Sequence, residues 1–134
     1  MEPGGCRSIR KTAKRALHSL LFDVLLSFHR GGTLTEVMNA QAFLPGQRTP
    51  GLGVWSHARS KTYKAVWDAF ILFDSPTTPG LKRGMQRLMW DIEVDGDQAV
   101  IEASSQFLDT NGNVLAATCA SGTGARLGQP EDED

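Results

Sequence analysis

The sequence has few of the residues from which metal and redox sites are built. Among its 134 residues are two cysteines, Cys6 and Cys119, which lie far apart and form no Cys-x-x-Cys pair. Its three histidines, His18, His29 and His57, are scattered along the chain. Protein zinc sites usually draw their ligands from short, regular spacings of these two residue types, so we expect no metal site and no cofactor.

Long apolar runs are also missing. No stretch of about 18 apolar residues occurs, so the sequence predicts no membrane-spanning helix. The segment RKTAKRALHSLLFDVLLSF begins like a signal peptide, but His18 and Asp23 interrupt its apolar part and no small-residue cleavage site follows. We therefore expect the chain, as it stands, in the cytoplasm.

The net charge gives no preference for nucleic acid or membrane, because its formal value is −1. The two ends differ in charge. We expect residues 1–21 to form a basic arm or short helix, whereas residues 128–134 end in the acids EDED. We favour a solvated terminus for the basic arm, because a few positive charges are a weak electrostatic footprint. The acidic tail is expected to be disordered, which leaves residues 22–127 as one domain.

The stretch FHRGGTLTEVM, residues 28–38, raises the choice between a phosphate-binding loop and a hairpin. A phosphate loop needs a longer glycine pattern followed by a helix. Here apolar and polar residues alternate on both sides of Gly31 and Gly32, which is the period of a β-strand. The stretch therefore predicts a β-hairpin whose turn uses glycine because it needs positive φ.

The alternation recurs along the rest of the chain. Turn sequences at Arg59–Lys61, SPTTPG, DGDQ and TNGN separate further alternating segments. We count seven strands from residue 22 onward, with a helical candidate only before them. Strands joined by short turns form an antiparallel up-and-down meander, which removes its edges by closing into an all-β barrel of seven or eight strands. A β-sandwich is the alternative.

Charge separates the two faces of these strands. One face of the segment 62–74 carries no charge, whereas the other carries Lys64 and Asp68. The uncharged face is therefore expected to point inward. Shifting the strand pairing by one residue would turn this whole face out to solvent. The same argument favours a four-residue DGDQ loop, because it places Trp90 and Ala103 on the same apolar face. A three-residue loop would instead place Trp90 opposite Glu102. Large inner residues are therefore expected at Trp55, Tyr63, Trp67, Trp90 and Phe107.

The last strand offers only small inner residues, namely Ala116, Thr118, Ala120 and Gly122. They either interdigitate with the tryptophans to fill the core or leave a cavity. An eight-stranded barrel is at the size limit where one small ligand fits inside. We favour the cavity.

Polar residues interrupt the inner face at a few positions. Glu36 lies among apolar residues of the first hairpin, and a buried carboxylate is costly unless it is paired or protonated. It is either a cavity acid or base or, as we favour, a rim residue or one turned outward by a bulge. His57, Tyr63 and Gln86 either orient a ligand in an apolar pocket or are ordinary rim residues.

Four segments resemble a group of small bacterial lipocalin-like barrel proteins without an established activity: LLSFHRGGTLTE, GVWSHARSKTYKAVWDAFILFD, RGMQRLMWDIEVDGD and FLDTNGNVLAATCASGTGAR. The resemblance covers about residues 22–127 and includes no catalytic motif. It implies a calycin-type antiparallel barrel, an apolar ligand, export from the cytoplasm, and a meeting of Cys6 with Cys119. The chain departs from the group at RSIRKTAKRALHS, where a first strand with a Gly-x-Trp signature would stand.

Three functions are compatible with these observations. The leading hypothesis is a non-enzymatic barrel that binds a small apolar or amphipathic molecule. The second is a cofactor-free cyclase or isomerase with Glu36, His57 and Tyr63 as acid and base candidates. The third is a homodimer formed through an open sheet edge. The ligand-binding residues would be Trp55, His57, Tyr63, Trp67, Gln86, Trp90 and Phe107.

Overall fold

The computed structural model describes residues 22–127 of the chain. Among the described residues no helix is long and apolar enough to cross a membrane. The expected basic arm or helix (1–21) and acidic tail (128–134) lie outside the described residues. The strands are β1 (Val24–His29), β2 (Thr33–Met38), β3 (Gly51–Arg59), β4 (Thr62–Ile71), β5 (Gly84–Asp95), β6 (Gln98–Leu108) and β7 (Val114–Ala125).

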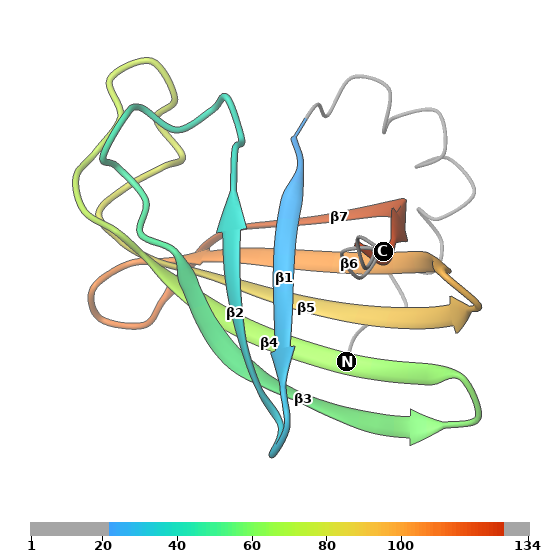
Figure 1. Cartoon of the computed structure of the whole chain (residues 1–134). Helices are drawn as coiled ribbons and strands as arrows, with labels where there is room; N and C mark the ends of the chain where they lie inside the picture. The colour runs from blue at the N-terminus through green and yellow to red at the C-terminus, as the bar shows by residue number, and fades with distance from the viewer. Residues whose placement is uncertain (1–21, 128–134) are drawn as a thin grey trace.

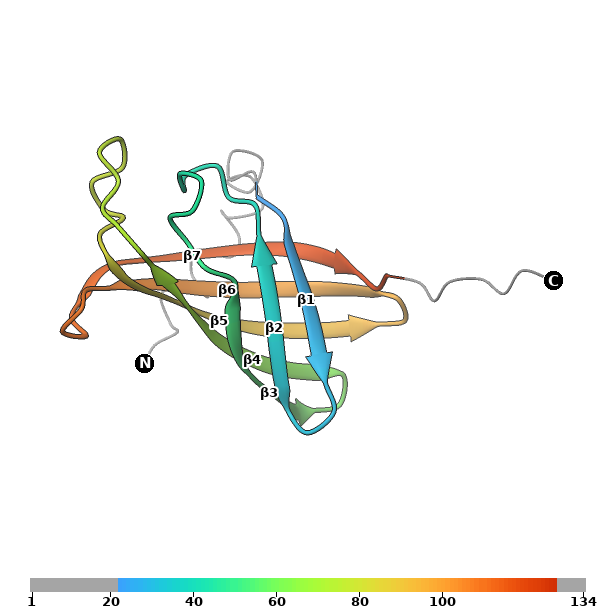
Figure 2. The same ribbon diagram turned by 60° about the vertical axis from the view of Figure 1, so that its left-hand side comes forward.

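All seven strands belong to one sheet, in which each strand pairs antiparallel with the next along the chain. This order confirms the all-β meander expected from the sequence. The sheet curls into a half-barrel, with β1 and β2 crossing over the direction of β5, β6 and β7 (Figure 1; Figure 2). Because β1 and β7 are the two edge strands, the ring of hydrogen bonds is not completed within residues 22–127.

Gly31 and Gly32 form the turn of the first hairpin, as the sequence predicts. Both have positive φ angles, 99° and 97°, in a region that residues with a side chain rarely adopt. The amide of Gly32 donates to the carbonyl of His29 at 3.1 Å, and the carbonyl of Gly32 accepts from the amide of Trp55 at 2.8 Å. The turn therefore starts β2 and also anchors β3.

The register of the later strands agrees with the separation of charged and apolar faces. Trp90 of β5 lies opposite Ala103 of β6, and Ala103 lies opposite Ala120 of β7. The DGDQ segment therefore sets the expected register, and Trp90 does not face Glu102. The inner face of the half-barrel is the uncharged face that the sequence predicts for β4 and β5.

The buried core lies toward one side of the half-barrel. Partly buried residues that pack against it include Ala99 and Ile101 of β6. The inner residues Ala116 and Ala120 of β7 are half-buried, so the interior is packed more densely at β2, β4 and β5. The core residues are Leu34, Ala65, Trp67, Leu88 and Ile92.

Two glycines of β3 leave room for the largest core side chain, Trp67, which is 1% exposed. A Cβ atom at Gly53 would overlap backbone atoms of Val66 and Trp67. A Cβ atom at Gly51 would overlap the Trp67 ring and the carboxylate of Glu36. Glycine inside a strand often marks such a close approach, and here the indole fills the slot that the two glycines leave.

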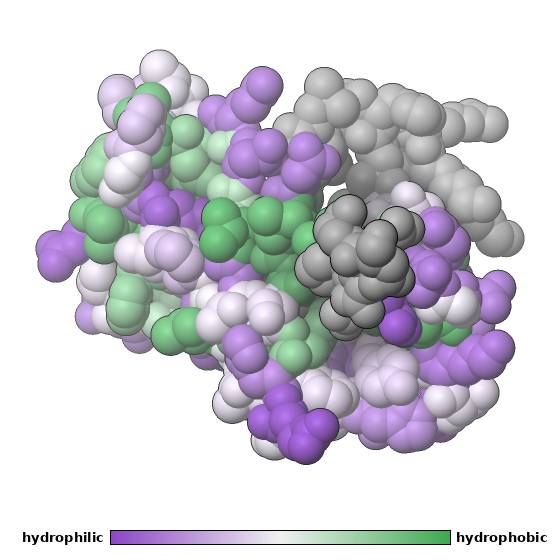
Figure 3. Space-filling model, in the orientation of Figure 1, coloured by the Kyte–Doolittle hydropathy of each residue, from purple (hydrophilic) through white to green (hydrophobic). Residues whose placement is uncertain are grey.

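The outer face of the sheet is apolar at one end and charged at the other. Leu25 and Val37, which are 62% and 56% exposed, lie opposite each other on β1 and β2. Apolar side chains gather over this part of the surface (Figure 3). On β4 and β5 the outer face instead carries ion pairs, and the amine of Lys64 lies 2.8 Å from Asp91 Oδ1. Apolar side chains are thus exposed on the outer face of the half-barrel as well as partly exposed on its inner face.

Cys119 lies on β7 opposite Ser104, on the face opposite to that of Ala120. Cys119 is disulfide-bonded. The other cysteine of the sequence, Cys6, lies outside the described residues. While the disulfide is intact, Cys119 has no free thiol that could act as a nucleophile.

The turn between β6 and β7 depends on the carboxylate of Asp109. This carboxylate accepts hydrogen bonds from the amides of Asn113 and Asn111, both at 2.9 Å. The bond from Asn113, more than that from Asn111, lowers the pKa of Asp109. Because the folded-state pKa is below the unfolded value, the contribution to stability is present above the unfolded pKa and is lost as the pH falls through the folded one.

We therefore expect Asp109→Ala to destabilise the protein at neutral pH and to have little effect in acid. Urea unfolding of the wild type and the variant, at pH 7 and at several pH values below about 4, measures the difference. The stability of the wild type should approach that of the variant as the pH decreases. A difference that is the same at every pH would show that the carboxylate is not the group that stabilises this turn.

Candidate functional site

The inner face holds a buried pair of opposite charges at the end of β2. The carboxylate of Glu36 points into the half-barrel and the residue is 1% exposed, so the expectation of a side chain turned outward by a bulge is wrong. Its partner is Arg48, which the sequence did not indicate as a site residue. The side chains of Arg48 and Glu36 are 5% and 0% exposed.

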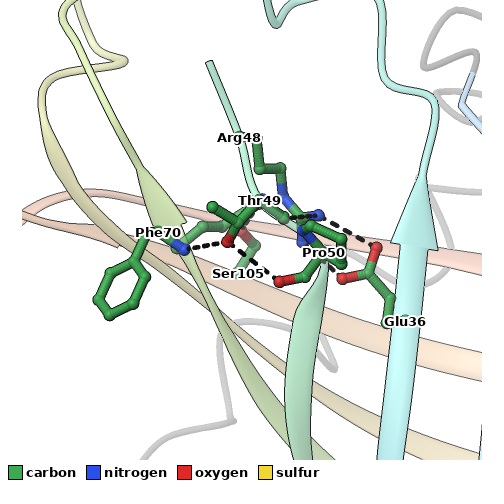
Figure 4. Close-up of polar contacts among 7 residues, drawn as sticks. Glu36, Arg48, Thr49, Pro50, Phe70 and Ser105 are labelled. Atoms are coloured by element: carbon green, nitrogen blue, oxygen red, sulfur yellow. Dashed lines mark hydrogen bonds and ion pairs between the residues drawn. The ribbon is translucent and has the colours of Figure 1, made fainter. Parts of the chain in front are cut away.

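The guanidinium of Arg48 contacts Glu36 through two parallel hydrogen bonds. Nη2 donates to Oε1 at 2.8 Å and Nη1 donates to Oε2 at 3.2 Å. Such bidentate pairs are the stronger kind of ionic hydrogen bond. Figure 4 shows the two side chains pointing toward each other where β2 ends and β3 begins. Each charge therefore neutralises the other.

The same guanidinium extends the polar contacts across the inner face. Arg48 Nε donates to Gln86 Oε1 at 2.6 Å, and Nη1 also donates to the carbonyl of Thr49 at 3.1 Å. Gln86 Nε2 in turn lies 3.2 Å from Ser105 Oγ. A chain of hydrogen bonds thus links β2, the loop before β3, β5 and β6. We call Glu36, Arg48, Gln86 and Ser105 the polar cluster.

The loop that carries Arg48 is fixed to the end of β4. The amide of Thr49 donates to the carbonyl of Phe70 at 3.0 Å, and the amide of Phe70 donates to Thr49 Oγ1 at 2.9 Å. The neighbouring Gln47 is fully buried, and its Nε2 donates to the carbonyl of Phe73 at 2.9 Å. These contacts hold the loop backbone, so the guanidinium is directed into the half-barrel.

The tryptophan, tyrosine and phenylalanine side chains expected to bind a ligand all lie on the inner face, and four of them form two pairs. Trp67 and Trp90 form one group, with ring centroids 4.9 Å apart in an edge-to-face arrangement. Trp55 and Tyr63 form the second, with centroids 6.1 Å apart. Phe107 of β6 lies opposite Gln86 and is half-buried. The structure thus places Trp67 and Gln86 in the buried interior, and Trp55, Tyr63, Trp90 and Phe107 at its partly exposed surface.

His57 and Tyr63 are cross-strand neighbours, as expected, with ring centroids 5.0 Å apart. His57 is exposed, and its Nε2 lies 2.7 Å from the carbonyl of Ser60. Glu36 lies opposite Gly51 at the other end of β3. Gly51 and His57 are six positions apart on β3, a separation of about 20 Å along the strand. The three acid and base candidates therefore do not form one site.

Within residues 22–127 no group of three or more His, Cys, Asp or Glu residues could hold a metal ion. No family model, curated protein or solved structure matches the chain. A function can therefore be inferred only from the residues of the inner face.

Proposed function

We propose that the inner face of the half-barrel binds one small apolar or amphipathic molecule. The supporting observation is a surface of half-buried residues on β5, β6 and β7. These residues lie next to the core, and their side chains are more exposed to solvent than those of the core. Binding sites for small molecules are mostly apolar, with a few polar groups that orient the ligand. This surface is formed by Trp90, Ala103, Phe107, Ala116 and Ala120.

The polar cluster supports an amphipathic ligand in particular. Ser105 lies on the inner face of β6, opposite Leu88 of β5 and Thr118 of β7. Apolar and polar side chains thus lie side by side on one surface. An apolar body would pack against Trp90 and Phe107, while a polar group would point toward Ser105. The resemblance to small lipocalin-like barrels is compatible with this proposal.

A neutral hydrophobic dye, N-phenyl-1-naphthylamine, tests the proposal. We expect saturable dye emission at one site per chain. Trp90→Leu should weaken binding about tenfold or more, because large aromatic anchors commonly contribute at least 1.4 kcal/mol, which corresponds to a factor of ten.

Met89→Ala is the matched control, because Met89 directly precedes Trp90 on β5 and its side chain points outward. Its dye affinity should equal that of the wild type. Emission that never saturates, or a loss of affinity in Met89→Ala with none in Trp90→Leu, would contradict a site on the inner face.

Self-association is a second candidate function. The edge strand β7 has the sequence VLAATCASGTGA, which contains no charged residue. Edge strands usually carry charges or other features that prevent pairing with another chain. We expect the wild type to sediment as a concentration-dependent dimer and Ala117→Lys, on β7, to remain monomeric. Gln106→Lys on the adjacent strand β6 is the control and should still dimerise, whereas a wild type that stays monomeric at all concentrations would exclude this function.

The enzymatic alternative has weaker support, because Glu36 is ion-paired and distant from His57.

We also propose a cellular compartment for the protein. The disulfide of Cys119 favours an oxidising compartment, as the resemblance implies, over the cytoplasm expected from the sequence, since disulfides are rare in reducing compartments.

A further inference from the structure

Two tryptophan side chains on the inner face have buried hydrogen-bond donors without an acceptor. Within the described part of the chain, neither Trp67 Nε1 nor Trp90 Nε1 has a hydrogen-bond partner. The third tryptophan differs, because Trp55 Nε1 donates to the carbonyl of His29 at 3.1 Å. The indole N–H is a donor only, so Trp67 and Trp90 each need an acceptor.

Such donors are unusual in a folded protein. Buried polar side-chain atoms nearly always have a partner, and leaving one unpaired destabilises the folded state. The two indole rings are in edge-to-face contact, so both donors belong to one aromatic pair. An acceptor atom that is brought in by a ligand would remove this cost.

The surroundings of Trp67 indicate the charge of that acceptor. The position of a Cβ on Gly51 would lie 3.2 Å from Trp67 Nε1 and would also contact Glu36 Oε1. The donor therefore lies beside a carboxylate that is already paired with Arg48. A second anion placed here would be repelled by Glu36 and would compete with it for Arg48, whereas a neutral acceptor would not.

We propose that the ligand of the inner face is a neutral amphipathic molecule whose hydroxyl or carbonyl oxygen accepts a hydrogen bond from the indole N–H of Trp67 or Trp90. This inference rests on the proposed function and adds the chemical class of the ligand. The apolar body packs on the half-barrel interior, and the polar oxygen lies next to the polar cluster.

Indole N–H resonances of the full chain, labelled with ¹⁵N-tryptophan, test this class with three probes of equal length. The probes are 1-octanol, octanoate and octane at neutral pH. We expect 1-octanol to shift the indole proton of Trp67 or Trp90 downfield and to leave that of Trp55 in place. Octane should bind without a downfield shift, and octanoate should bind at least tenfold more weakly than 1-octanol.

Phenylalanine variants separate the donor from the ring. Trp90→Phe and Trp67→Phe keep an aromatic side chain, and at least one of them should lose the preference for 1-octanol over octane. Trp55→Phe is the control and should keep it. If 1-octanol binds without shifting either indole, or if octanoate binds as tightly, the inference is overturned while the proposed function stands. If none of the three probes binds, the proposed function fails together with the inference.

Discussion

Arg48→Met is expected to destabilise the protein by about 3–5 kcal/mol, because it leaves the carboxylate of Glu36 buried without a cation. The side chain of Glu36 is fully shielded from solvent, so water cannot replace the lost partner. The variant also removes the donor to Gln86 Oε1. Methionine has a length similar to that of arginine, so the loss of packing is kept small.

The control for Arg48→Met is a second arginine that is paired on the surface. Arg87 makes two hydrogen bonds to Asp68, at 2.8 Å and 3.0 Å, but the two side chains are 44% and 35% exposed. Surface ion pairs contribute about 0–1 kcal/mol, so Arg87→Met should have a small effect. Urea unfolding of both variants measures the difference, and equal losses of stability would contradict a buried ionic contact at Arg48.

A double variant distinguishes an unpaired charge from a general loss of packing. Adding Glu36→Leu to Arg48→Met removes the buried carboxylate, so the double variant should be more stable than Arg48→Met alone. A double variant less stable than Arg48→Met would indicate that Glu36 stabilises the fold through contacts other than its pairing with Arg48.

Gly53→Ala is expected to destabilise the fold by about 3 kcal/mol or more, at or above the usual range for overpacked cores. The added methyl group would overlap the carbonyl of Val66 and the backbone of Trp67. Backbone atoms of a paired strand cannot move aside as the end of a flexible side chain can. Either β3 separates from β4, or Trp67 leaves its slot.

Gly80→Ala, in the loop between β4 and β5, is the control for the glycine substitution. A Cβ atom there would meet nothing within 4 Å, so the change should stay within about 0.5 kcal/mol. Thermal unfolding followed by tryptophan fluorescence compares the two variants. If Gly53→Ala unfolds at the temperature of the wild type, the packing of Trp67 against β3 is wrong.

The order and register of the strands could be predicted because they depend on local signals. Gly31 and Gly32 marked a turn that needs positive φ, and alternation on either side marked the strands. The placement of Trp90 opposite Ala103 followed from charge, because the other register would have brought Trp90 against Glu102. Each of these inferences used residues close together in the sequence.

The polar cluster could not be predicted, because its contacts join distant residues through a loop without periodicity. Arg48 and Gln86 are separated by 38 positions, and no strand pattern directs Arg48 inward. An inner-face carboxylate at Glu36 signals the need for a cation, but it does not identify which one. Gly53 lies directly opposite Trp67 in the β3–β4 pairing, so this half of the slot follows from the same register that places His57 opposite Tyr63. The approach of the Trp67 ring to Gly51 does not follow from that pairing.

The most direct test of the proposed binding surface is to locate a bound probe by intermolecular nuclear Overhauser effects. The half-barrel exposes apolar residues on both faces, and Leu52 and Val54 on the outer face are exposed. With N-phenyl-1-naphthylamine bound to the full chain, we predict contacts from the dye to the side chains of Trp90, Phe107 and Ala120. Contacts to Leu52 and Val54 with none to these three would contradict a ligand site on the inner face.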